Sequence, residues 1–239
     1  MPERFIAVRN KSDAPKRYGL VASPISPDTD ANGLPAYECL YKVSKKIASP
    51  KGSVVFKISD PMVAVCGIAE EGLKPGARLD ASDWASIEAA TAGSLGSRVS
   101  MRVAPGHAPT FDLSATTKNV EGVGRWIMKA EPGFDLGGST DVEEEPPFIG
   151  YGLADANDPN DIVPLVIWEA QPGAVYVVRC ESRWTVYCLT DDKVGDHYIL
   201  AMNGGAMLQS PQIDFRNKTA TYVEVVHQSE NVFDITDFD

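Results

Sequence analysis

The sequence predicts an all-β fold of antiparallel β-sandwich or β-barrel modules, two of which are expected, with one short helix. Apolar residues alternate with polar ones at the strand period of two far more often than at the helical period of 3.6. Turn-forming residues are frequent, with 20 glycines and 17 prolines in 239 residues, above their average share of roughly 12%. Because only one segment has a helical pattern, a doubly wound α/β sheet and a Rossmann enzyme are disfavoured.

The expected strands are short runs rich in β-branched and aromatic residues, separated by Pro, Gly, Asp and Ser. They cover residues 5–8, 18–21, 37–43, 53–58, 62–68, 125–130, 162–169, 174–181, 184–190, 197–202 and 219–227. A spacing of roughly ten residues between strands is typical of sandwiches and barrels. The expected helix covers residues 82–90, where Ser82 or Asp83 is available to cap the first turn.

One change in composition suggests how the chain is divided. Residues 131–147 combine glycines, an acidic run and a Pro-Pro pair, which is the composition of a linker or a long exposed loop. We therefore expect an N-terminal β domain in residues 1–130, an acidic Gly/Pro linker or loop in residues 131–147, and a C-terminal β domain in residues 148–239. The alternative is one continuous domain with an acidic surface loop.

The charge balance bears on the expected partners. The chain has 22 Lys and Arg against 33 Asp and Glu, a formal net charge of −11. Phosphate binding needs a basic patch, and the one dense basic stretch is short, so we expect no nucleic-acid partner. No apolar run approaches the roughly 20 residues that cross a bilayer, and residues 1–10 lack the apolar core of a signal peptide. We therefore expect neither a membrane partner nor secretion by that route.

A short motif suggests a cation site. Residues 28–33 read D-T-D-A-N-G, in which oxygens at alternate positions converge on a hard cation and the glycine permits a sharp turn. The twelfth position of this loop is Cys39 where an EF-hand needs a glutamate, so an EF-hand is excluded. Asp28, Asp30 and Asn32 are candidate metal ligands for a weaker Ca²⁺ site, and a polar turn is the alternative. No other cofactor is expected.

No pattern predicts catalysis. The chain has no G-x-S-x-G nucleophile elbow, and His107, His197 and His227 are scattered, so we expect no catalytic residue and no enzyme. The cysteines form no C-x-x-C pair and are interpreted as buried thiols. A disulfide between Cys180 and Cys188 across a hairpin is the alternative.

The four tryptophans allow two interpretations. Trp84, Trp126, Trp168 and Trp184 offer the aromatic faces on which sugars stack, but most lie inside alternating apolar runs, which favours core packing. The alternative function is therefore a carbohydrate- or ligand-binding β-sandwich module, with or without calcium at residues 28–32. A hydrolase that uses two carboxylates is a third alternative, for which the sequence identifies no residues.

Residues 5–21, F-I-A-V-R-N-K-S-D-A-P-K-R-Y-G-L-V, resemble the start of uncharacterised β-rich structural proteins of tailed bacteriophages and prophages. In these proteins a short strand ends in (R/N)-N-x-S, polar residues and a proline follow, and a second apolar strand begins. Residues 63–79 are similar to the turn-and-strand pattern of the same proteins, and the resemblance covers roughly the first third of the chain.

The resemblance implies a non-enzymatic virion protein, such as a head decoration protein or a head or tail surface subunit. It would form homo-oligomers and dock on other virion structural proteins through strand edges and apolar patches. Its location would be the virion, and the host cytoplasm before assembly. The negative charge agrees with this role because it keeps free subunits soluble.

Overall fold

The computed structural model describes residues 3–22, 34–58, 62–104, 106–133, 145–154, 161–179, 183–190, 197–200, 208–215, 221–229 and 232–238. In these ranges every regular element is a strand, apart from one 3₁₀ turn, η1, at Leu113–Ala115. The predicted all-β class is confirmed. No helix in the described ranges is long and apolar enough to cross a membrane.

The strands form four sheets. Sheet I has the order β18 (Phe233–Phe238), β17 (Tyr222–His227), β1 (Arg4–Asn10) and β5 (Ser53–Ile58). Sheet II has the order β16 (Ile213–Asp214), β15 (Arg183–Leu189), β2 (Arg17–Ala22) and β4 (Leu40–Val43). Sheet III has the order β3 (Tyr37–Glu38), β13 (Ile162–Glu169), β12 (Pro147–Ala154), β6 (Met62–Ala69) and β7 (Leu79–Ser86). Sheet IV has the order β10 (Thr117–Val120), β8 (Gly96–Arg102), β11 (Arg125–Ala130) and β14 (Val175–Arg179), with β9 (Thr110–Phe111) beside β8.

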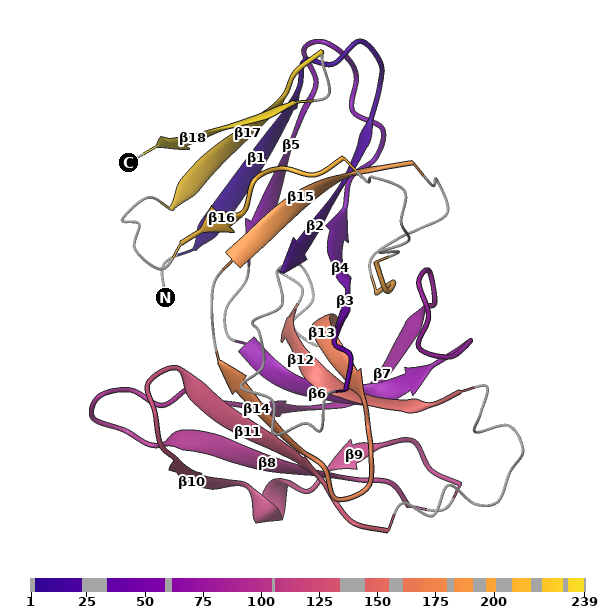
Figure 1. Ribbon diagram of the computed structural model, residues 1–239, viewed down its shortest axis with the longest axis vertical. Helices are drawn as coiled ribbons and strands as arrows, with labels where there is room; N and C mark the ends of the chain where they lie inside the picture. Colours follow the sequence, from indigo (N-terminus) through magenta and orange to yellow (C-terminus); the bar gives the residue numbers. More distant parts are fainter. Residues whose placement is uncertain are drawn as a thin grey trace.

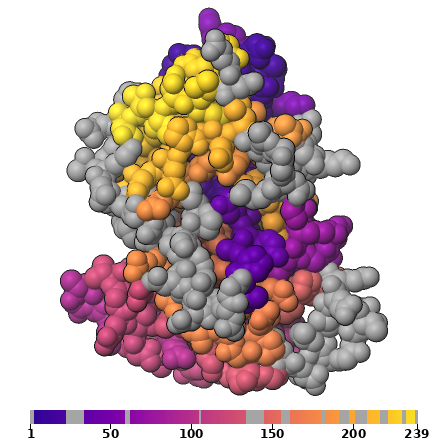
Figure 2. All heavy atoms as spheres, viewed as in Figure 1, coloured from indigo at the N-terminus to yellow at the C-terminus, as the bar shows by residue number. Residues whose placement is uncertain are grey.

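The sheets pack in pairs as two modules. Sheets I and II form the first module, at the top of Figure 1, and sheets III and IV form the second module below it. The first module combines both ends of the chain, and the second uses its middle, as the indigo and yellow atoms at the top of Figure 2 and the magenta atoms at the bottom illustrate. The chain leaves the first module after Ile58 and returns to it before Arg183. Apart from β3, which belongs to sheet III but precedes Ile58, the second module is therefore an insertion into the first.

The strand pairing does not follow the expected boundary at residues 131–147. Every sheet combines strands from before and after this stretch: β1 pairs with β17, β2 with β15, β6 with β12, and β11 with β14. Most of the stretch, residues 134–144, lies outside the described residues. A Gly/Pro-rich acidic composition indicates a connection between elements, but it does not record which earlier strand the chain pairs with afterwards.

The middle strands of sheet III are buried on both faces, which explains their nearly continuous apolar runs. One face packs on sheet IV, where Trp126, Tyr151, Trp168 and Tyr176 form a row with successive ring centroids 6.3, 6.3 and 5.9 Å apart. The other face packs on Cys39 and Ile199. Gly150 in β12 is required by this packing, because a Cβ there would collide with the carbonyl oxygen of Val166 in β13.

The helix expected over residues 82–90 is wrong. Residues up to Ser86 belong to β7, which pairs with β6 along its whole length, and the chain then leaves regular structure. Asp83 does not cap a helix: its Oδ1 accepts a hydrogen bond from the Trp84 N–H, and its Oδ2 accepts one from the Phe111 N–H, both at 2.8 Å. Pairing with β6 and the hydrogen bond from β9 to Asp83 thus outweigh the helix propensity of this Ala-rich run.

Two short segments join the modules, and we call residues 37–43 and 197–200 the junction. The first runs through β3 in sheet III and β4 in sheet II, with a bridge from Cys39 to Ile199 between them. Backbone hydrogen bonds attach the second segment on both sides: the Leu200 N–H donates to Glu38 O at 2.8 Å, and the Ile199 N–H donates to Ala77 O at 3.0 Å. Ile199 packs on sheet III, whereas Leu200 packs in a cluster with residues of sheet II.

Ile199→Ala tests how much the packing at the junction contributes to the free energy of unfolding. Ile199 is buried, so its truncation leaves a cavity between the junction and sheet III, and we expect a loss of about 2–5 kcal/mol in the free energy of unfolding. Urea denaturation followed by fluorescence measures this loss. Val123→Ala, at a side chain that is 71% exposed, is the control and should change stability by less than about 0.5 kcal/mol. If the two variants lost the same amount of stability, Ile199 would not stabilise the fold by its packing at the junction.

Candidate functional site

Large apolar side chains are exposed at few places in the described ranges, namely at Val55, Trp84, Leu95, Leu113, Val123 and Val232. Only Val55 and Trp84 lie in strands, and the other four lie in turns, loops or η1. Single exposed apolar residues in loops are ordinary. An exposed valine in the outermost strand of a sheet is informative, because it accompanies unpaired backbone groups. The outer edge of β5 is therefore the candidate site.

Strand β5 pairs with β1 on one side and is the last strand of sheet I on the other (Figure 1). The Phe5 N–H donates to Thr221 O on the β17 side, so strand alternation turns the backbone groups of Ile6 and Val8 towards β5. Their partners are Phe56 and Val54. The N–H and C=O groups of Ser53, Val55 and Lys57 consequently point away from β1, towards the open edge.

Little of the described chain covers this edge. The Tyr41 hydroxyl donates to Lys57 O at 3.3 Å, which covers the carboxyl end of the strand. The backbone N–H and C=O of Val55 have no hydrogen-bond partner in the described ranges, and its side chain is 54% exposed. The neighbouring Val54 and Phe56 pack inward and hold β5 in place. The outward N–H and C=O of Val55 therefore stay in a geometry that can bond to a further strand.

The two outer strands of sheet I differ in their protection against pairing. Strand β18, at the other edge, carries Asp234 and Asp237, and charges on an outer strand discourage unwanted pairing. The centre of β5 is Val-Val-Phe and has no charge. The charge of β5 is confined to Lys57, near its carboxyl end, so its centre is less protected than that of an edge with charges at both ends.

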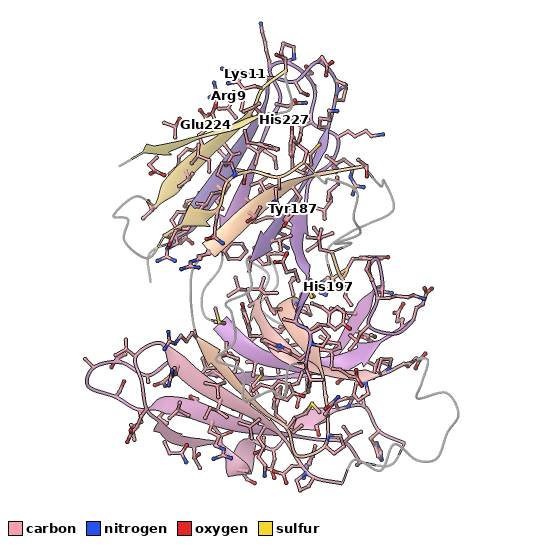
Figure 3. The ribbon with its side chains drawn as sticks, viewed as in Figure 1. Arg9, Lys11, Tyr187, His197, Glu224 and His227 are labelled. Atoms are coloured by element: carbon pink, nitrogen blue, oxygen red, sulfur yellow. The ribbon has the colours of Figure 1, made fainter. Side chains whose placement is uncertain are left out.

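Charges near the open edge are paired within the protein. Lys57 Nζ lies 2.5 Å from Glu3 Oε1. On the same outer face, Arg9 of β1 lies 2.6 Å from Glu224 of β17. Figure 3 labels both residues. Exposed ion pairs add little to stability, about 0–1 kcal/mol each. Here they neutralise two cations that lie on the outer face of sheet I, in or next to β5.

The candidate calcium ligands Asp28, Asp30 and Asn32 lie outside the described residues. Elsewhere in the described chain, no three His, Cys, Asp or Glu side chains gather in an arrangement that could hold a metal ion.

The three histidines have separate surroundings. His227 is buried in the first module, with Nδ1 2.9 Å from the Tyr18 hydroxyl and its ring stacked on Phe233 at 4.6 Å. Burial raises the pKa of Tyr18, so this phenol stays protonated as a hydrogen-bond partner. His197 lies at the junction, 3.4 Å from Asp161, and His107 is exposed in a turn (Figure 3 labels His197 and His227).

The tryptophans divide into two groups. Trp126, Trp168 and Trp184 are buried, as core packing predicts, so none of the three offers a face to a sugar. Trp84 on β7 is 40% exposed.

The cysteines contribute no nucleophile in the described ranges. Cys39, Cys66 and Cys188 are free and buried, and burial raises the pKa of each thiol, which lowers its reactivity. Cys180 lies outside the described residues. A Cys180–Cys188 disulfide is not formed, because Cys188 is a free thiol. The hairpin assumed for it is also absent, since β14 and β15 belong to different sheets.

One titratable group at the junction, Glu38, lies in no motif that the sequence analysis identified. Glu38 on β3 is largely buried, and its Oε2 accepts no hydrogen bond from the described residues. Burial raises the pKa of Glu38 to about 7. The pKa of Tyr187 in sheet II is raised to about 12, by burial first and by the charge of Glu38 second. Glu38 thus faces the first module from a strand of the second.

Comparisons with known proteins gave no match: no family model, no curated protein and no solved structure is similar to this chain.

Stability should depend on the protonation of Glu38. The folded protein holds this proton up to about pH 7, whereas the unfolded chain releases it near pH 4.5, so the folded state binds more protons in this window. The free energy of unfolding should therefore fall as the pH rises from about 4.5 to 7, by about 2 kcal/mol for this group after allowance for its partial exposure. Urea denaturation at a series of pH values measures the change.

Glu38→Gln supplies the control, because it retains the shape of the side chain without the ionisation. The stability difference between variant and wild type should grow in favour of the variant as the pH rises through this window. A difference that stays constant from pH 4.5 to 8 would mean that Glu38 is solvated like an ordinary surface carboxyl.

Proposed function

We propose that the protein is a non-enzymatic structural subunit that acts by self-association through the open edge of β5. The observation that carries the proposal is the centre of β5, where Val55 lies between two apolar residues and its outward backbone groups have no partner in the described chain. Such an edge is a template for a further strand, and a protein that leaves it unprotected needs an occupant for it.

A second copy of β5 fits this edge in an antiparallel arrangement. With a two-fold axis at Val55, each Val55 faces its own copy, and Ser53 faces Lys57 of the other molecule. No like charges meet in this register, and the central contact between two valines is of the kind that stabilises sheets. Two copies of sheet I then form one continuous sheet, and the interface is isologous, as closed two-fold symmetry requires.

The wider setting of the proposal comes from the resemblance of residues 5–21 and 63–79. It supports a bacteriophage virion protein, a head decoration or a head or tail surface subunit, which is in the host cytoplasm before assembly and docks on other virion structural proteins. The net charge of −11 supports the same role, since it keeps free subunits soluble. No nucleic acid or membrane is part of the proposal.

The burial of the described cysteine thiols and of His227 supports the non-enzymatic part of the proposal. The thiols of Cys39, Cys66 and Cys188 are buried and protonated, and His227 packs in a core beside Tyr18. These are structural surroundings, in which a nucleophile or a base has no access to a substrate.

Two substitutions at Val55 test the proposal. Val55→Lys places two like charges opposite each other at the symmetry axis. Val55→Pro removes the outward N–H without affecting a bond to β1, because that N–H points away from β1. Light scattering on a sizing column should give a multimer of the 25.8 kDa chain for the wild type, and each variant should weaken association about tenfold or more, equivalent to roughly 1.4 kcal/mol.

Val123→Lys, which adds the same charge at an exposed turn, is the matched control and should keep the wild-type mass. Circular dichroism and urea denaturation show whether each variant is folded. A wild type that stays monomeric at high concentration, or a multimer that both Val55 variants retain, would refute self-association through β5.

A further inference from the structure

The second exposed apolar residue in a strand, Trp84, lies in a surface hollow of the second module, which we call the Trp84 hollow. It has a volume of about 420 Å³ and lies between β7, the beginning of β13 and the junction. Its walls include Arg78 before β7, Asp80 in β7, Asp161 before β13, and His197 from the junction. It therefore combines one exposed aromatic face with several polar groups.

The walls of the Trp84 hollow are held in position. The Trp84 N–H donates to Asp83, whose second oxygen accepts from the Phe111 N–H of β9. His197 is fixed because its carbonyl accepts from the Leu79 N–H at 2.9 Å, and it adopts a φ of 69°, which is uncommon for a residue with a side chain. A site built before its ligand arrives loses less conformational entropy on binding.

The chemistry of the Trp84 hollow matches a saccharide. The apolar C–H face of a sugar ring stacks on an exposed indole, and its hydroxyl groups bond to surrounding carboxylate, guanidinium and imidazole groups. Trp84 is suited to this role because the other three tryptophans are buried. The neighbouring Ala85 packs into the core, which holds this part of β7 in place and leaves Trp84 on the outer side of the strand.

The charges in the Trp84 hollow restrict the class of saccharide. Three acidic residues, Asp80, Asp83 and Asp161, are among its walls, against one residue with a guanidinium, Arg78. This guanidinium already pairs with Glu70 at 3.2 Å. A uronic or sialic acid would meet net repulsion, whereas a neutral or amine-bearing sugar would not.

We propose that the Trp84 hollow binds a saccharide without acidic groups, with Trp84 as the stacking platform. This site is separate from the β5 edge, because β7 belongs to the second module and β5 to the first (Figure 1). The two proposals therefore succeed or fail independently.

A glycan array that carries neutral, amine-bearing and acidic glycans is the test, probed with the full-length protein. Retention should be confined to neutral and amine-bearing glycans. Trp84→Ala should lower the apparent affinity about tenfold or more, since it removes the stacking surface. Val123→Ala is the control for the loss of an exposed apolar side chain elsewhere and should bind as the wild type does.

Acrylamide quenching of tryptophan fluorescence gives a second measurement on the same samples. Trp84 is the exposed tryptophan, so a retained glycan should protect the fluorescence of the wild type from quenching and leave that of Trp84→Phe less affected. Asp161→Asn, at a partly exposed side chain, should weaken the discrimination against acidic glycans.

Three results would overturn the proposal: no glycan retained on the array, acidic glycans retained as well as neutral ones, or undiminished binding by Trp84→Ala. Light scattering of Trp84→Ala separates this proposal from self-association, since the variant should keep the wild-type mass.

Discussion

The crossing of residues 37–43 with residues 197–200 fixes how the two modules are joined. Tyr37 and Glu38 belong to sheet III, and Leu40, two residues after Glu38, already belongs to sheet II. Its carbonyl and amide groups are buried here and must be paired, and the second segment supplies partners on both sides. A slip of one residue would turn Ile199 and Leu200 to the wrong clusters, so both sheets lose their packing together. The junction also contains a destabilising group: the Oε2 atom of Glu38 is buried and accepts no hydrogen bond in the described chain.

Local sequence patterns predict the strands whose composition is unambiguous, and β5, β11 and β13 have the expected bounds. The same patterns fail where tertiary contacts decide. Strand β12 was not expected because Pro147, Gly150 and Gly152 have the composition of turns, although a glycine is needed there for close approach to β13. Strand β7 has an Ala-rich run that favours a helix until β6 pairs with it. Sheet order is also non-local: β1 pairs with β17 from the other end of the chain, and no pattern in either strand records that.

The candidate sites depend on this non-local information. The run Ser53–Ile58 is recognisable as a strand, but its position at the edge of sheet I follows only from the order of the whole sheet. Likewise Trp84 and Trp126 both occur among small and apolar residues, yet one lies outside its sheet and the other in a core. In both cases the sequence identifies the chemical group, and the topology decides whether it meets solvent. Asp28, Asp30 and Asn32 stay a prediction from the motif alone, because they lie outside the described residues.

The arrangement of the modules connects the two proposals. The proposed self-association uses the first module, and the Trp84 hollow lies in the second, so the proposed multimer would leave the hollow uncovered by that contact. The junction holds the modules together through buried backbone hydrogen bonds, which sets a fixed geometry between one hollow and the next in a symmetric assembly. Single saccharide sites built on one aromatic face bind weakly, and several sites at fixed spacing gain apparent affinity through their effective concentration. An assembling subunit with one shallow hollow therefore needs no deep pocket to hold a glycan-bearing surface.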